Sequence, residues 1–340
     1  MLGCKKWLKP VYFIVILFTI TVMLVFPDVC KSGVSRGMLI CSNVIIPSLF
    51  PIMVCILIIM KLNIMSKSRL FSVMLFSILG GYPMGCKLIN ELYVQNKINK
   101  SSANIMQMYC VNAGPAFIIS AVGNGVLGSS KIGMVLFASH ITATFIIAVI
   151  ASAFGFKAKQ ICNIPLKNDK SFSEIFVTAT ADASKSTLSI CSFIIVFSVI
   201  NSYIAYFFES YPTLKLVTYF TEVSFGVTQT KNIPFISFLL GFSGISIWFQ
   251  LISISKDVKL NLKYFMFGRI LHGTISSAIT VIILKLFNIT VSAFSNNRFI
   301  TSKLFYNSIS ISISLAIMII LWIISLYTEK NSSKLLDNMI

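Results

Sequence analysis

Gly80-Gly81-Tyr82-Pro83-Met84-Gly85 interrupts an apolar sequence of membrane length, and two similar interruptions follow it along the chain. They are Asn112-Ala113-Gly114-Pro115 and Gly241-Phe242-Ser243-Gly244. Such breaks leave backbone N–H and C=O groups outside the regular helical pattern. In hydrocarbon, irregular backbone persists only where it is buried in protein or lines a water-filled cavity. The three breaks therefore predict interrupted helices around a transport site.

The composition is that of a membrane protein. Of the 340 residues, 56% are hydrophobic and 11% are charged, and the mean hydropathy is +0.88. A water-soluble globular domain does not have these values. At about 20 apolar residues per crossing, the apolar stretches have room for about seven or eight spans and some shorter re-entrant pieces. The predicted fold class is an all-α polytopic membrane protein.

The net charge of +18 does not point to nucleic acid. The basic residues gather between apolar segments, at residues 61–69, 157–170 and 256–263, as expected of cytoplasmic loops. The eight cysteines form no C-x-x-C pair or zinc-type spacing, and no Walker-type loop is present. We expect no metal, no cofactor and no nucleic-acid partner.

The start of the chain resembles a signal sequence without a cleavage site. Lys5, Lys6 and Lys9 precede an apolar run from residue 11 to 26, and no small-residue cleavage motif follows. We expect residues 1–37 to be an uncleaved anchor helix and loop with a cytoplasmic N-terminus. The last expected helix, at about 308–328 within a C-terminal segment 291–340, returns the C-terminus to the cytoplasm.

Between these ends the chain divides into two units with the same order of parts. The first covers residues 38–155, a basic cytoplasmic linker covers 156–185, and the second unit covers 186–290. Each unit has a long crossing, a short apolar run, a glycine-interrupted crossing and a final crossing. The expected ranges are 38–60, 69–80, 103–127 and 133–154 in the first unit, and 187–208, 214–228, 233–254 and 265–288 in the second. The short runs cannot span a bilayer, so we expect them to re-enter from one side.

The two histidines of the chain support this division. His140 lies 26 residues after Gly114, and His272 lies 28 residues after Gly244. The first unit starts outside and the second starts inside, so we interpret them as inverted repeats. In secondary transporters built on this plan, the substrate site lies near the midplane where the repeats meet.

Three stretches resemble the signature sequences of the YlbJ family of sporulation integral membrane proteins, whose members carry the nucleoside recognition, or Gate, domain. They are residues 80–87 (GGYPMGCK), residues 112–118 (NAGPAFI) and residues 241–246 (GFSGIS). The resemblance covers about residues 38–290. It departs from the family pattern at Cys86, where a small residue such as alanine is usual, and it is looser in the second half.

The resemblance implies a Gate-domain-like transporter of endospore-forming bacteria, located in the outer, mother-cell-derived forespore membrane. There it would pass dipicolinic acid, alone or with calcium, toward the forespore. Two alternatives stay open: a transporter of nucleosides or other small metabolites, and a non-transporting scaffold of the sporulation membrane. The sequence also leaves open a homo-oligomer or another membrane partner. No catalytic arrangement of residues points to an enzyme.

Dipicolinate is a planar aromatic dianion, so its site needs N–H or cationic donors and a flat apolar slot. The N-terminus of a half-helix presents free N–H groups and a partial positive charge. The candidate substrate-binding residues lie at or near the breaks: Gly81, Tyr82, Pro83, Gly85, Lys87, Asn112, Gly114, Pro115, Gly244 and Gln250.

Several of these candidates have a second interpretation. Asn112 either binds a carboxylate or caps the broken helix. Tyr82 either stacks on the pyridine ring and donates its hydroxyl or is an ordinary tyrosine of the membrane interface. Lys87 either pairs with the anion or sets the topology, and Gln250 is expected to face the same cavity.

Four ionisable residues are candidates for coupling or for a structural role. Glu222 either pairs with a cation such as Arg269 or takes part in proton or calcium coupling. Arg269 lies inside an apolar crossing, where it either faces a cavity or partner or extends to the interface. His140 and His272 either relay protons or hydrogen-bond to neighbouring helices.

Overall fold

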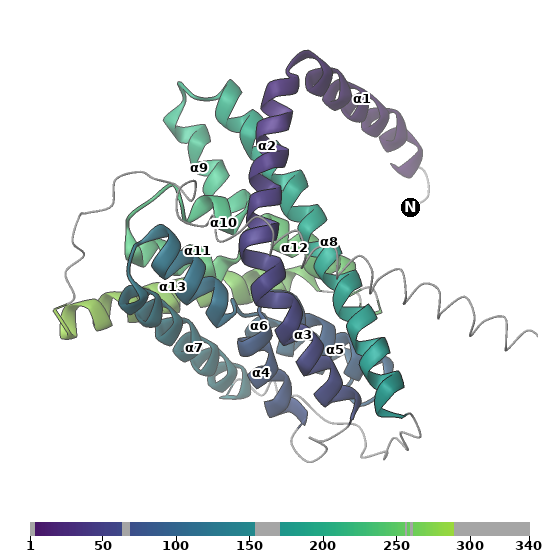
Figure 1. Ribbon diagram of the computed structural model, residues 1–340, viewed down its shortest axis with the longest axis vertical. Coiled ribbons are helices and arrows are strands. Elements are labelled where there is room, and N and C mark those ends of the chain that lie inside the picture. The colour runs from purple at the N-terminus through teal and green to yellow at the C-terminus, as the bar shows by residue number, and fades with distance from the viewer. Residues whose placement is uncertain (1–3, 63–68, 154–170, 256, 259–260, 289–340) are drawn as a thin grey trace, which may run out of the picture.

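The computed structural model describes residues 4–62, 69–153, 171–255, 257–258 and 261–288, and every element in them is a helix (Figure 1). Five helices in this part are long and apolar enough to cross a membrane, at residues 27–61, 130–151, 172–207, 233–254 and 262–286. The expectation of an all-α polytopic membrane protein is confirmed.

Five crossings are fewer than the seven or eight that we expected, for three reasons. The crossing expected at residues 103–127 is split into two helices that are each too short to span. The first helix offers only a short apolar segment, Lys9–Val25, among the residues searched. The helix expected at 308–328 lies outside the described residues.

The described residues of the first half of the chain form nine helical segments. They are α1 (Cys4–Val25), α2 (Pro27–Ile40), the π-helical turn η1 (Cys41–Ile45), α3 (Ile46–Lys61), α4 (Arg69–Gly80), α5 (Tyr82–Val94), α6 (Lys100–Tyr109), the π-helix η2 (Ala116–Val126) and α7 (Ser130–Ala153). The second half contains α8 (Phe172–Phe207), α9 (Pro212–Thr221), α10 (Val223–Gly226), α11 (Ile233–Phe242), α12 (Gly244–Ile254) and α13 (Leu262–Leu286).

Both long helices begin earlier than we expected. The segments α2, η1 and α3 form one helix that starts at Pro27, a residue favoured in the first helical turn. Helix α8 starts at Phe172, inside the expected linker 156–185. A capping box precedes it, in which Ser171 and Glu174 bond to each other's backbone N–H. The polar residues of these segments had suggested loops.

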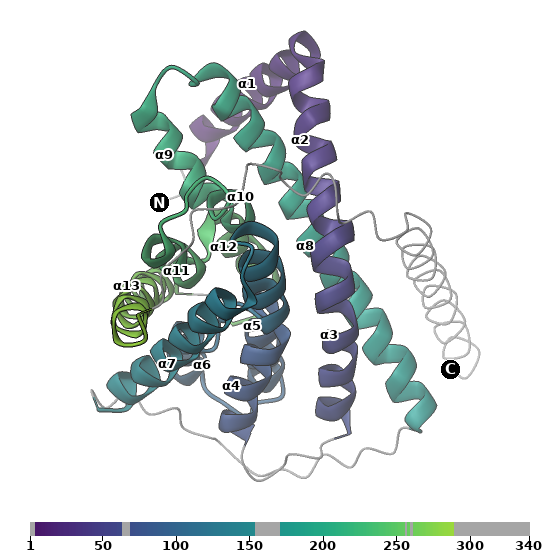
Figure 2. The same ribbon diagram turned by 60° about the vertical axis from the view of Figure 1, so that its left-hand side comes forward.

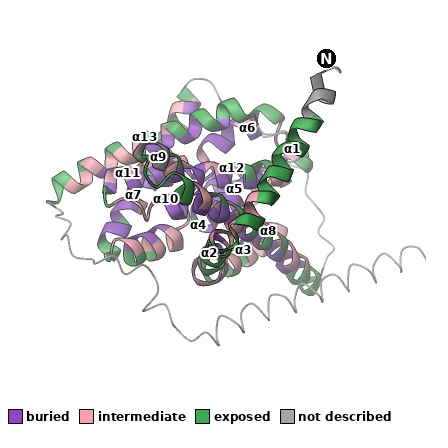
Figure 3. Ribbon diagram, turned by 90° about the horizontal axis from the view of Figure 1, so that it is seen from above, coloured by how far each residue is buried: buried purple, intermediate pink, exposed green. Residues whose placement is uncertain are grey.

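The two long helices run antiparallel and side by side (Figures 1 and 2). Gly33 and Gly37 of α2 face the α8 backbone so closely that an added Cβ on Gly33 would lie 2.6 Å from Val199 Cα. Small residues allow such close backbone contact between membrane helices. Helix α1 turns away from this pair, and most of its described side chains are exposed (Figure 3).

Polar contacts join the long helices at both ends. Lys61 Nζ lies 2.9 Å from a carboxylate oxygen of Asp182 at the end where α3 finishes. At the other end, the Tyr203 hydroxyl donates to the Phe26 carbonyl at 3.0 Å. These contacts fix the position of one long helix along the axis of the other.

Two short helical hairpins enter the bundle from opposite ends (Figure 2). Helices α4 and α5 pack together and are separated by Gly81, which has a φ of 79°. Helices α9 and α10 meet at Glu222 after the far end of α8. With 12 and 13 residues, α4 and α5 are each about 20 Å long at 1.5 Å per residue, less than a bilayer core of about 30 Å.

We expect Gly33→Val to destabilise the protein, because the added atoms overlap the backbone of α8. Overpacking of this kind costs about 1–3 kcal/mol. Thermal unfolding of the purified protein measures the effect. Gly125→Ala is the control, because its added methyl meets only one atom, at an ordinary distance of 3.7 Å. Equal melting temperatures for the two variants would contradict the proposed helix contact.

Candidate functional site

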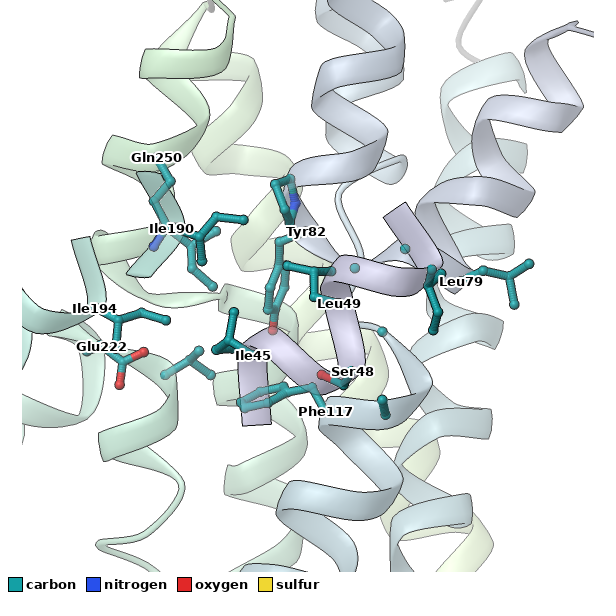
Figure 4. A pocket seen from close by; sticks show the side chains of 18 residues that line it. Ile45, Ser48, Leu49, Leu79, Tyr82, Phe117, Ile190, Ile194, Glu222 and Gln250 are labelled. Carbon is teal, nitrogen blue, oxygen red and sulfur yellow. The ribbon is translucent and has the colours of Figure 1, made fainter. Parts of the chain in front are cut away.

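A cavity lies where the first two glycine breaks meet the long helices (Figure 4). It contains about 600 Å³ of empty space, part of which is open to the surroundings. Its walls come from η1 and α3, from α8, from the starts of α5 and η2, and from α10 and α12. Polar side chains are few: Ser48, Tyr82, Glu222 and Gln250. The cavity is therefore an apolar slot with a small number of polar groups.

Two helix N-termini meet at this cavity. Helix α5 starts at Tyr82 and η2 starts at Ala116, and neither has a side-chain cap. Gly81 and Gly114 precede these starts, and a Cβ added to Gly114 would lie 3.3 Å from Gly81 N. Uncapped N-termini present free N–H groups and the positive end of the helix dipole. An anionic group is the ligand that this arrangement favours.

The predicted residues separate into two groups. Those that line the cavity are Gly81, Tyr82, Pro83, Gly114, Gln250 and Glu222. Those that do not line it are Gly85, Lys87, Asn112, Pro115, Gly244, Arg269, His140 and His272. Sequence reasoning missed the apolar walls, which include Leu49, Phe117, Ile190, Ile194 and Ile247. No local pattern distinguishes these residues from other apolar residues of a membrane helix.

Tyr82 projects into the middle of the cavity (Figure 4). Its hydroxyl donates to the Leu240 carbonyl at 2.6 Å. Leu240 lies in the last turn of α11, where carbonyls lack helical partners. The ring is thus a wall of the cavity, while the hydroxyl connects α5 to the second half of the chain.

Asn112 completes the second break instead of facing the cavity. Its Nδ2 donates to Ser77 Oγ at 2.9 Å and to the Tyr109 carbonyl at 3.0 Å. Its Oδ1 accepts from Thr144 Oγ1 at 2.6 Å. The buried amide therefore joins α4, α6 and α7, as the capping interpretation expects.

Lys87 is directed toward α8 and away from the cavity. Its ammonium donates to the Asp182 carbonyl at 3.1 Å and to Ser186 Oγ at 3.0 Å. Burial lowers the pKa of Lys87, and the carboxylates of Asp182 and Glu91 oppose this effect. In this conformation Lys87 does not line the cavity.

Glu222 caps a helix and does not pair with Arg269. Its carboxylate accepts the Phe225 N–H at 2.7 Å, at the N-terminus of α10. The same carboxylate lies at the edge of the cavity (Figure 4). Arg269 instead donates to main-chain carbonyls. Of the two interpretations of Glu222, the structure does not show the ion pair with Arg269, because backbone groups at the breaks bind both side chains.

The two histidines meet where α7 crosses α13, with ring centroids 4.2 Å apart. His140 Nε2 accepts the Ala113 N–H at 3.0 Å, so the ring stabilises the second break. His272 Nε2 donates to the His140 carbonyl at 3.0 Å. Both Nδ1 atoms are buried and have no hydrogen-bond partner among the described residues. Each histidine is bound to main chain, as the structural interpretation expects.

We expect Asn112→Ala to destabilise the protein, because it leaves several buried groups unpaired. Each unsatisfied buried group costs about 1–3 kcal/mol. The melting temperature of the purified variant measures this loss. Asn124→Ala is the matched control, since Asn124 is exposed and its side chain accepts one bond, from Ser130 Oγ. A stable Asn112→Ala variant would show that the break does not depend on this amide.

Comparison with known proteins gives one informative match. No protein-family model matches the chain, and no solved structure matches it. The chain is 23% identical over 250 residues to the sporulation integral membrane protein YlbJ of Bacillus subtilis (strain 168). The match covers 60% of this chain and 61% of that protein's length. This similarity confirms the resemblance to the YlbJ family of sporulation integral membrane proteins.

Proposed function

We propose that this protein is a transporter that moves dipicolinic acid, alone or as its calcium complex, across the outer forespore membrane toward the forespore. The observation that carries the proposal is the meeting of two uncapped helix N-termini, those of α5 and η2, at an apolar cavity. Helix N-termini suit carboxylates, and the apolar walls suit a flat aromatic ring.

Glu222 favours a substrate whose charge is partly neutralised. Its carboxylate lies at the cavity edge and would repel a free dianion. A calcium complex of dipicolinate carries no net charge, and its cation would be attracted to Glu222. The N-termini and Glu222 together therefore fit a chelate with a carboxylate end and a metal end.

We also propose that the two halves are inverted repeats of a Gate-like fold. Each half has a long helix, a short hairpin, an interrupted helix and a helix with a histidine. The hairpins enter from opposite ends, and the histidines of the two halves are in contact. In transporters of this plan, the site between the repeats opens alternately to each side.

The proposed topology follows from the basic segments. The basic residues gather at residues 61–69, 157–170 and 256–263, between apolar segments. Because cytoplasmic loops carry an excess of Lys and Arg, we place these segments, with both termini, in the cytoplasm of the mother cell.

Nucleoside transport is the second candidate. The observation that favours it is the position of Glu222 and Gln250 in the same cavity, since a carboxylate and an amide are suitable partners for a nucleobase. Uptake into vesicles containing the purified protein separates the candidates. Uptake of nucleosides without uptake of dipicolinate, tested with and without calcium, would contradict the main proposal.

The first experiment measures dipicolinic acid in the mother cell and in the spore of a strain that lacks this protein. We expect the acid to accumulate outside the forespore and the spores to lack it. Normally filled spores would rule out the proposed transport. A scaffold role predicts that cavity variants fill spores normally when the protein is as abundant as the wild type.

Complementation with Gly114→Val tests the cavity itself. The added side chain meets the backbone of Gly81, where the two N-termini converge. We expect the affinity for dipicolinate to weaken about tenfold, equivalent to about 1.4 kcal/mol, and spore dipicolinic acid to fall as a result. Gly125→Ala, matched for membrane abundance, is the control. Full spores with Gly114→Val would contradict the position of the site.

A further inference from the structure

Arg269 is a buried cation in the first half of α13. Its side chain is 0% exposed, so it does not extend to the interface. The guanidinium donates to the Met108 carbonyl at 2.5 Å, to the Val111 carbonyl, and to the Gly241 carbonyl at 3.4 Å. The guanidinium carbon, Cζ, lies 5.7 Å from the centre of the Phe265 ring. Among the described residues, no carboxylate lies within ion-pair distance of it.

The three acceptor carbonyls come from the ends of broken helices. Met108 lies in the last turn of α6, and Val111 lies in the break that follows. Gly241 lies in the last turn of α11, directly before the break at Ser243. The last carbonyls of a helix lack helical partners and form the negative end of its dipole. Two negative helix ends, one from each half of the chain, therefore converge on the guanidinium.

In transporters with broken helices, unwound carbonyls and helix C-termini are the groups that coordinate a coupling cation such as Na⁺. Here the same kind of groups surround a side chain that is always charged. We propose that Arg269 is a built-in replacement for a coupling cation, so that neither folding nor transport requires Na⁺.

This role also explains how the cavity favours anions. At each break, the helix before it has a negative C-terminus. After the second break, at residues 112–115, η2 presents a positive N-terminus to the cavity. Arg269 compensates the negative ends of α6 and α11, so the N-terminal charge of η2 is not cancelled across the break. This second step and the Na⁺-independence of transport rest on the proposed function, whereas the Na⁺-independence of folding does not.

Thermal unfolding of the purified full-length protein in lipid nanodiscs tests the proposal without a transport substrate. We expect the wild-type melting temperature to be the same in NaCl and in choline chloride of equal ionic strength. We expect Arg269→Ala to melt lower and to regain at least about 2 °C with millimolar guanidinium, but not with equimolar urea, because a bound cation stabilises the folded state.

Arg36→Ala is the matched control. Arg36 also lies over a phenylalanine ring, 5.2 Å from the centre of Phe225, but it is exposed. Guanidinium should not raise the melting temperature of the Arg36→Ala variant. A folded Arg269→Ala variant that responds to neither guanidinium nor Na⁺ would overturn the proposal.

If Arg269→Ala does not fold, thermal unfolding of the wild-type protein with and without Na⁺ tests the proposal. Unfolding that shifts with Na⁺ overturns the replacement of the coupling cation, and unfolding that is independent of Na⁺ supports it. Dipicolinate uptake by wild-type vesicles in choline medium is the transport test. Uptake that requires Na⁺ overturns the proposal, whereas absence of uptake in every medium contradicts only the proposed function.

Discussion

The need to pair the backbone groups of interrupted helices in an apolar environment governs this structure. Buried side chains meet that need at the second and third breaks. His140 accepts an N–H of the second break, and Tyr82 donates to a terminal carbonyl of α11. Arg269 donates to carbonyls from both halves. Because an unpaired group at this depth costs several kcal/mol, these contacts make the breaks stable enough to form a site.

The same need separates structural polar groups from the groups that face the cavity. Asn112, Arg269 and the histidines bond to main chain behind the breaks and do not line the cavity. What remains at the cavity is apolar wall, helix N-termini, and the polar side chains of Ser48, Tyr82, Glu222 and Gln250. Selectivity would then depend on the shape of the slot and on backbone dipoles more than on a charged side chain.

The sequence predicted the breaks and the short helices well, because glycine, proline and segment length are local signals. It did not predict where α8 begins, although Ser171 and Glu174 form a recognisable capping box. The sequence could not predict the hydrogen-bond partners of Lys87 and Arg269, because those partners include main-chain carbonyl oxygens, which every residue carries. The apolar lining residues, such as Phe117 and Ile190, depend on how distant helices pack.

The antiparallel pair of long helices has a mechanical consequence. It is joined by Lys61 and Asp182 at one end and by Tyr203 and Phe26 at the other, with glycine-mediated contact between them. The same pair supplies one wall of the cavity. Under the proposed transport function, a wall fixed in this way stays still, and the movement that opens the cavity comes from the short hairpins and interrupted helices opposite it.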